Sequence, residues 1–137
     1  MPQQNRPRLS TLGAPTFQRT QRLSADDMLA LCRSFPSTCT TLTQWDPDAL
    51  DSLGVEIWSD LSESWDPVFA MDEEADDLPG LPNILQYLTT IRFLLCLWDD
   101  RRKWESGSFD AMKALLDIWD DDHRAAFLAW AQAPLCP

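Results

Sequence analysis

The chain is poor in the residues that build metal and phosphate sites. It has a single histidine, His123, and its four cysteines form no Cys-x-x-Cys pair. A zinc site needs several such ligands at close spacing, and no Asp-x-Asp-x-Asp-Gly calcium loop is present. The four glycines lie far apart, which leaves no phosphate-binding loop. We therefore expect neither a metal nor a cofactor. The cysteines are Cys32, Cys39, Cys96 and Cys136.

Signatures of nucleophilic catalysis are also missing. There is no Gly-x-Ser-x-Gly motif, and only one histidine could act as a base. Carboxylates are abundant, with 22 Asp and Glu residues, so no single pair of them stands out as catalytic. We expect a protein that is not an enzyme, in which His123 is partly buried with its hydrogen bonds satisfied.

No apolar run is long enough to cross a membrane. The longest covers residues 84–98 and carries Arg92 near its middle. A span needs about 20 apolar residues, and a central charge is costly. The first thirty residues lack the apolar core of a secretory signal, so we expect reduced cysteines and a cytoplasmic or nuclear location.

The net charge of −11 is unevenly distributed. Residues 1–23 carry four Arg and no acid, whereas residues 24–91 carry fourteen acids against Arg33 alone. Nucleic-acid phosphates require Lys and Arg opposite them, so we expect no direct nucleic-acid binding, and anionic membranes would repel the acidic body. Residues 1–23 show no apolar periodicity, which predicts a disordered basic tail ahead of a helical domain at residues 24–137.

The apolar spacing predicts an all-α fold, a small bundle of four or five helices, because no alternating strand pattern occurs. Ser24 is a suitable N-cap for a helix that stops before Pro36. Asp46 and Pro47 predict the start of a second helix, with Trp45 packing on Leu50 as a hydrophobic staple. Its apolar stripe comprises Leu50, Leu53, Ile57 and Leu61.

Further helices are predicted along the rest of the chain. Trp65-Asp66-Pro67 repeats the start signal of Trp45-Asp46-Pro47 and predicts a separate short helix. Pro82 opens an almost wholly apolar helix, expected to be central and to end near Trp104 or Glu105. Ser108 is the expected cap of one last helix. Its inward stripe is expected to comprise Phe109, Met112, Leu116, Trp119, His123, Ala126 and Trp130.

The pairs Trp98-Asp99 and Trp119-Asp120 are interpreted as boundaries between buried and solvated helix faces. We expect Trp98, Trp119 and Trp130 to be core residues.

An acidic, Trp-bearing region extends from Trp45 to Asp77. Trp is an effective interface anchor, and surrounding charges set association rate and specificity. We therefore expect a regulatory factor that binds a partner protein with a basic or groove-like surface, as an accessory protein of a virus, phage or bacterium. The oligomeric state is left open. The candidate partner-binding residues are Trp45, Trp58, Trp65, Asp72, Glu73, Glu74, Asp76 and Asp77.

Other interpretations of the same region remain. The carboxylates could stand in for phosphates and block a DNA- or RNA-binding protein, or they could simply form a solvated acidic surface that aids solubility. The stretch Leu81-Pro82-Asn83-Ile84-Leu85 resembles the opening of an F-box, which implies an adaptor that docks to a cullin ubiquitin ligase. The presence of only two lysines, Lys103 and Lys113, suits such an adaptor by limiting its own ubiquitination.

Overall fold

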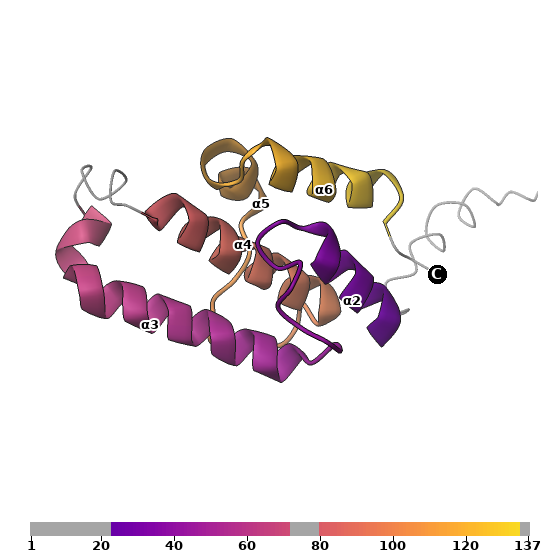
Figure 1. The fold of residues 1–137 in the computed structure, drawn as a ribbon, viewed down its shortest axis with the longest axis horizontal. Coiled ribbons are helices and arrows are strands. Elements are labelled where there is room, and N and C mark those ends of the chain that lie inside the picture. The colour runs from indigo at the N-terminus through magenta and orange to yellow at the C-terminus, as the bar shows by residue number, and fades with distance from the viewer. Residues whose placement is uncertain (1–22, 72–79, 135–137) are drawn as a thin grey trace, which may run out of the picture.

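The computed structural model describes residues 23–71 and 80–134, and from residue 64 to 71 it describes the backbone alone. The described part of the chain has an all-α fold, with helices and connecting loops but no strand, which confirms the predicted fold class (Figure 1). The tail predicted at residues 1–23 therefore lies outside the described residues, apart from Leu23. The elements are α2 (Ala25–Ser34), α3 (Pro47–Met71), α4 (Leu81–Trp98), α5 (Ala111–Lys113), the π-helical η3 (Ala114–Ile118) and α6 (Asp121–Gln132).

The first predicted helix start is confirmed at α2. The Ser24 hydroxyl accepts a hydrogen bond from the Asp27 amide, at 3.1 Å, and the helix ends before Pro36. Leu23, which the sequence analysis assigned to the tail, is buried at 7% exposure. The packed part of the chain therefore includes the residue before the cap.

Helix α3 begins as predicted at Pro47, where the Asp46 carboxylate accepts hydrogen bonds from the amides of Asp48 and Ala49. The prediction of a separate helix at Trp65-Asp66-Pro67 is wrong, because α3 runs on to Met71. An interior proline removes one backbone hydrogen bond and kinks a helix without having to end it. In Figure 1 the last turns of α3 bend away from its axis.

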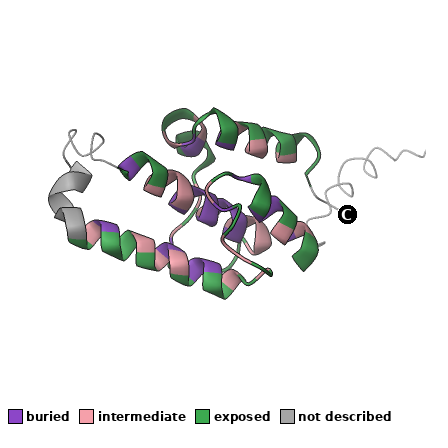
Figure 2. Ribbon diagram, in the orientation of Figure 1, coloured by how far each residue is buried: buried purple, intermediate pink, exposed green. Residues whose placement is uncertain are grey.

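Helix α4 is central, as predicted, and contacts α2, α3 and η3. Figure 2 shows buried positions along its length and on the side of α3 that faces it. Its predicted end near Trp104 or Glu105 is wrong, since the helix ends at Trp98 and Asp99 is extended. The Trp104 indole N–H donates to the Asp99 carbonyl at 3.2 Å, so the chain folds back instead of continuing as helix.

The single last helix is replaced by three pieces. Asp110, and not Ser108, caps α5 by accepting from the Lys113 amide. Trp119 then leaves the helical conformation, and Asp120 caps α6 by accepting from the His123 amide at 2.9 Å. The pair Trp119-Asp120 therefore marks a helix start.

This interruption also alters which side chains face inward. Met112 and Leu116, which the predicted stripe placed inside, are 68% and 70% exposed. The predicted stripe assumed an unbroken helix with about 100° per residue. The helix is instead broken by a π-helical turn at Ala114–Ile118 and by the extended residue Trp119, which changes the direction in which the side chains point. The prediction is wrong at these two positions.

An aromatic cluster closes the core. Trp119 is buried, as predicted, while Trp98 and Trp130 are half-buried and pack against the core. The Phe93 ring on α4 lies at the centre of the cluster, with centroids 5.1 Å from Phe109 and 5.2 Å from Trp130. Such pairs contribute about 0.5–1.5 kcal/mol each beyond the burial of their area. The cluster holds α6 and the chain after α4 against the central helix.

Candidate interaction cleft

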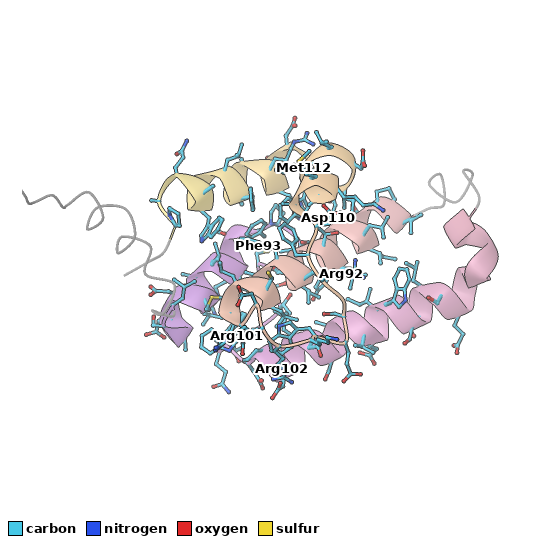
Figure 3. All side chains as sticks on the ribbon, turned by 180° about the vertical axis from the view of Figure 1, so that it is seen from behind. Arg92, Phe93, Arg101, Arg102, Asp110 and Met112 are labelled. Carbon is cyan, nitrogen blue, oxygen red and sulfur yellow. The ribbon has the colours of Figure 1, made fainter. Side chains whose placement is uncertain are left out.

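A cleft of about 660 Å³ opens between α3, the first three turns of α4 and the chain from Ser108 to Ile118. In Figure 3, which shows the molecule from behind, Arg92 lies beside the 99–110 segment, and Asp110 lies at its α5 end. The cleft is lined by Trp58, Leu81, Pro82, Leu85, Thr89, Arg92, Ser108, Phe109, Asp110, Lys113, Asp117 and Ile118.

Trp58 provides the exposed aromatic surface of the cleft. Its side chain is 40% exposed, and it is one of four large apolar residues that lie exposed in the described part of the chain. The other three, Met112, Leu116 and Leu128, do not line the cleft. Among the described residues, Trp58 is thus the exposed large apolar side chain that lines this cleft.

Arg92 provides a half-buried positive charge. Its Nε donates to the Ser106 carbonyl at 2.6 Å. Burial lowers the pKa of its guanidinium group, because the charged form loses hydration. Among the side chains described at residues 23–63 and 80–134, no carboxylate forms an ion pair with it.

The wall beside Arg92 is held by a buried carboxylate on α3. Asp51, 7% exposed, accepts hydrogen bonds from the amides of Ser106, at 2.9 Å, and Glu105, at 3.3 Å. Gly107 has φ 105°, and a Cβ there would lie 3.1 Å from the Arg92 Nε. Asp51 and Arg92 therefore hold the 99–110 segment from two helices, and the glycine lets it pass close to the guanidinium.

Asp51 was not predicted from the sequence, and Arg92 served there only as an argument against a membrane span. Both carried the same signal, a charged residue within an apolar helix face. A buried charge requires a partner, so such positions were candidates for loop anchors.

Two of the predicted partner-binding residues, Trp45 and Trp58, have described side chains, and these two lie in different surroundings. Trp58 borders the cleft, whereas Trp45 is half-buried against the core, with its ring centroid 5.7 Å from that of Trp98. Trp45 lies just before the start of α3, and the helix rises about 16 Å from Pro47 to Trp58. The side chain of Trp65 is not among those that the structure describes. The predicted acidic residues also lie outside the described part of the chain; they are Asp72, Glu73, Glu74, Asp76 and Asp77.

Three exposed acids of α3 occupy a different side of the helix from Trp58. At about 100° per residue, Glu56, Asp60 and Glu63 lie about 140–160° around the helix from Trp58, whereas the buried Asp51 lies on its side. Trp58 falls at the edge of the buried side. These three carboxylates and the Trp58 indole therefore lie on different sides of α3, whereas the prediction placed the acids and tryptophans of residues 45–77 on one surface.

His123 forms a hydrogen-bonded relay with Ser37 and Asp120. Its Nδ1 lies 2.7 Å from the Asp120 carboxylate and its Nε2 lies 2.9 Å from the Ser37 hydroxyl. His123 is buried and its hydrogen bonds are satisfied. These bonds from the histidine lower the pKa of the Asp120 carboxyl group.

This order of groups is that of a nucleophilic triad, but acyl transfer also needs oxyanion donors and a cleft that admits the carbonyl group. Ser37 does not line the cleft, and its hydroxyl also hydrogen-bonds Thr90, at 3.2 Å. Thr90 in turn donates to the Gln86 carbonyl and accepts from the Trp119 indole. We interpret the relay as a clamp that joins α6 and α4 to the turn after α2.

Metal ligands do not cluster in the part of the chain that the structure describes, where no three His, Cys, Asp or Glu residues could hold an ion together. None of its helices combines the length and apolar character needed to cross a membrane. Comparisons with protein-family models, with curated proteins and with solved structures found no match. A functional assignment therefore depends on the cleft itself.

Proposed function

We propose that the protein is a non-catalytic, regulatory binding factor that recognises a partner protein through the cleft, with Trp58 as the principal anchor. The observation that carries the proposal is an exposed indole beside a concave surface that is lined by both apolar and charged side chains. A volume of about 660 Å³ falls within the range of ligand-binding clefts, and Trp is enriched among the residues that dominate binding energy.

The charge of the chain supports a partner with a basic surface around the inserted group. Glu56, Asp60 and Glu63 project from α3 away from the core, and exposed charges of one sign accelerate encounter with an oppositely charged protein. Cys32 and Cys39 are free thiols, which suits a reducing compartment. We therefore place the protein in the cytoplasm or nucleus, as an accessory factor of a virus, phage or bacterium.

The test begins with affinity purification from the native or host cell, followed by titration calorimetry with the purified partner. Trp58→Ala should weaken binding by about thirtyfold, the effect of losing an anchor worth about 2 kcal/mol. Met112→Ala is the matched control, because Met112 is also exposed and apolar but lies outside the cleft. It should change the affinity less than twofold. Equal affinities for wild type and Trp58→Ala would refute the proposal.

The nucleic-acid-mimic alternative is favoured by one observation, the exposed acidic side of α3. Its three carboxylates are spaced about 6 Å and 4.5 Å along the helix axis. Under this alternative, the combined change of Glu56→Gln, Asp60→Asn and Glu63→Gln should abolish binding, duplex DNA or RNA should compete, and Trp58→Ala should have little effect.

The F-box-like alternative makes a different prediction about the start of α4. Leu81, Pro82 and Leu85 all line the cleft, and Leu81 is buried at 1% exposure. An adaptor should retain a cullin complex in a pull-down, and Leu85→Ala should release it while Met112→Ala should not.

A further inference from the structure

We infer that the cleft recognises a peptide segment of its partner in which a carboxylate lies next to a large apolar side chain, and that Arg92 binds the carboxylate. This inference rests on the proposed function and adds the chemistry of the bound segment. It follows from the state of Arg92, whose Nε is used internally while its two terminal nitrogens have no acidic partner among the described residues.

Because Arg92 is half-buried, its charge decides the preference of the cleft for a carboxylate ligand. A cation that has lost part of its hydration is stabilised most by a carboxylate that supplies hydrogen bonds and opposite charge together. The Nη1 and Nη2 groups of a guanidinium can donate to both oxygens of one carboxylate, which an ammonium group cannot reproduce. An entering Asp or Glu side chain, or a terminal carboxylate, meets both requirements.

The other charges of the cleft oppose this preference only weakly. Asp110, Lys113 and Asp117 are exposed, and the Asp110 carboxylate already accepts the amide of Lys113 as a helix cap. Charges in water interact several-fold more weakly than charges in a partly buried site. The half-buried guanidinium therefore outweighs the two solvated acids.

The apolar half of the proposed ligand follows from the neighbours of Arg92 in the lining. Trp58, Leu85 and Phe109 present aromatic and aliphatic surface within the same cleft, so a large apolar side chain adjacent to the carboxylate would cover them. A phosphate group could also pair with Arg92, but a nucleic-acid strand would have to approach a chain of net charge −11. We therefore assign the site to a peptide.

The experiment is a selection from a random peptide library displayed on phage, run in parallel against the full-length wild type, Arg92→Met, Lys113→Met and Trp58→Ala. Wild type should enrich peptides with Asp or Glu beside a large apolar residue. Arg92→Met should enrich apolar peptides without the acid, and Trp58→Ala should enrich none. Lys113→Met is the matched control, because it removes an exposed cation of the same cleft and should keep the acidic preference.

The affinities of synthetic peptides then give the decisive number. Replacing the acid by its amide should weaken binding to wild type about tenfold or more and leave binding to Arg92→Met unchanged. Circular dichroism and thermal melting of Arg92→Met establish that the variant is folded, and Arg92→Lys, which keeps the charge, should restore only part of the preference.

Two failures are distinguishable. If wild type selects peptides that need Trp58 but show no acidic preference, or if amide and acid bind alike, the role of Arg92 is refuted and the proposed function stands. If no peptide depends on Trp58, both the proposed function and this inference are refuted. Selection of phosphate-bearing nucleic acid over the peptides, in a parallel oligonucleotide library, would also overturn the assignment to a peptide.

Discussion

Gly54 offers a sharp test of how α3 is packed against the wall of the cleft. A Cβ at this position would lie 2.9 Å from the Ser106 Cβ and 3.3 Å from the Ile91 Cγ2, whereas carbon atoms in contact prefer about 3.5–4.0 Å. Ser106 cannot easily retreat, because its amide is bonded to Asp51 and its carbonyl to Arg92.

Two effects of Gly54→Ala oppose each other. Alanine raises helix propensity by about 1 kcal/mol relative to glycine, while overpacking a dense interior costs about 1–3 kcal/mol. Because the 99–110 segment is held at both backbone groups of Ser106, we expect the upper half of that cost. The net result is a loss of about 1–2 kcal/mol in the free energy of unfolding.

Urea denaturation followed by Trp fluorescence measures this difference. Ser59→Ala is the control, since Ser59 is exposed on the same helix, and its effect should stay within about 0.5 kcal/mol. A Gly54→Ala variant that is more stable than wild type would show that propensity dominates, and that the close approach of α3 to Ser106 does not exist in solution.

Three further predictions concern polar side chains that are hydrogen-bonded within the fold. Asp51→Ala should destabilise the fold by about 2–4 kcal/mol, because it leaves the amides of Glu105 and Ser106 unpaired. Chemical denaturation measures this loss, with Asp48→Ala as the control, since Asp48 is an exposed acid of the same helix. Equal losses for the two variants would contradict the role of Asp51 as an anchor. Ser37→Ala should lower the free energy of unfolding by about 1–3 kcal/mol, because it leaves buried His123 without its Nε2 partner. A fluorophosphonate probe, which labels reactive serines, should not label Ser37 of the wild type. Labelling detected by intact mass would refute the interpretation of Ser37, His123 and Asp120 as a structural clamp. The lowered pKa of Asp120 means that its carboxylate adds stability above its ordinary pKa, and that this contribution is lost as the pH falls through the folded value. The stability difference between wild type and Asp120→Asn should therefore shrink in denaturation curves from about pH 5 to about pH 2.5, and a constant difference would exclude this linkage.

Local signals in the sequence correctly predicted where α2 and α3 start. Ser24 and Asp46 cap the helices that follow them, because an N-cap acts within three residues and needs no distant partner. The Trp-Asp pairs are explained in part by the same chemistry, since Asp46 and Asp120 are both caps. Trp58, a candidate partner-binding residue of the sequence, is 40% exposed, because it falls off the centre of the apolar stripe of α3.

The errors arose where distant residues compete with local preference. Helix α4 stops at Trp98 because the 99–110 segment is bound by Asp51 from α3 and by Arg92 from α4 itself. The sequence of residues 99–110 itself contains no signal that predicts these hydrogen bonds to Asp51 and Arg92. The cleft could not be predicted for the same reason, because its lining comes from three parts of the chain.

The sequence by itself determined the all-helical class, the capped starts of α2 and α3 and the central place of α4, because capping and apolar periodicity act over a few residues. Tertiary structure alone decided where α4 ends, that the last helix is broken at Trp119, and that Trp58 and Arg92 share a cleft while Trp45 packs on the core. Burial and hydrogen bonding between distant residues stabilise these arrangements, and their free energy exceeds the small differences in local propensity.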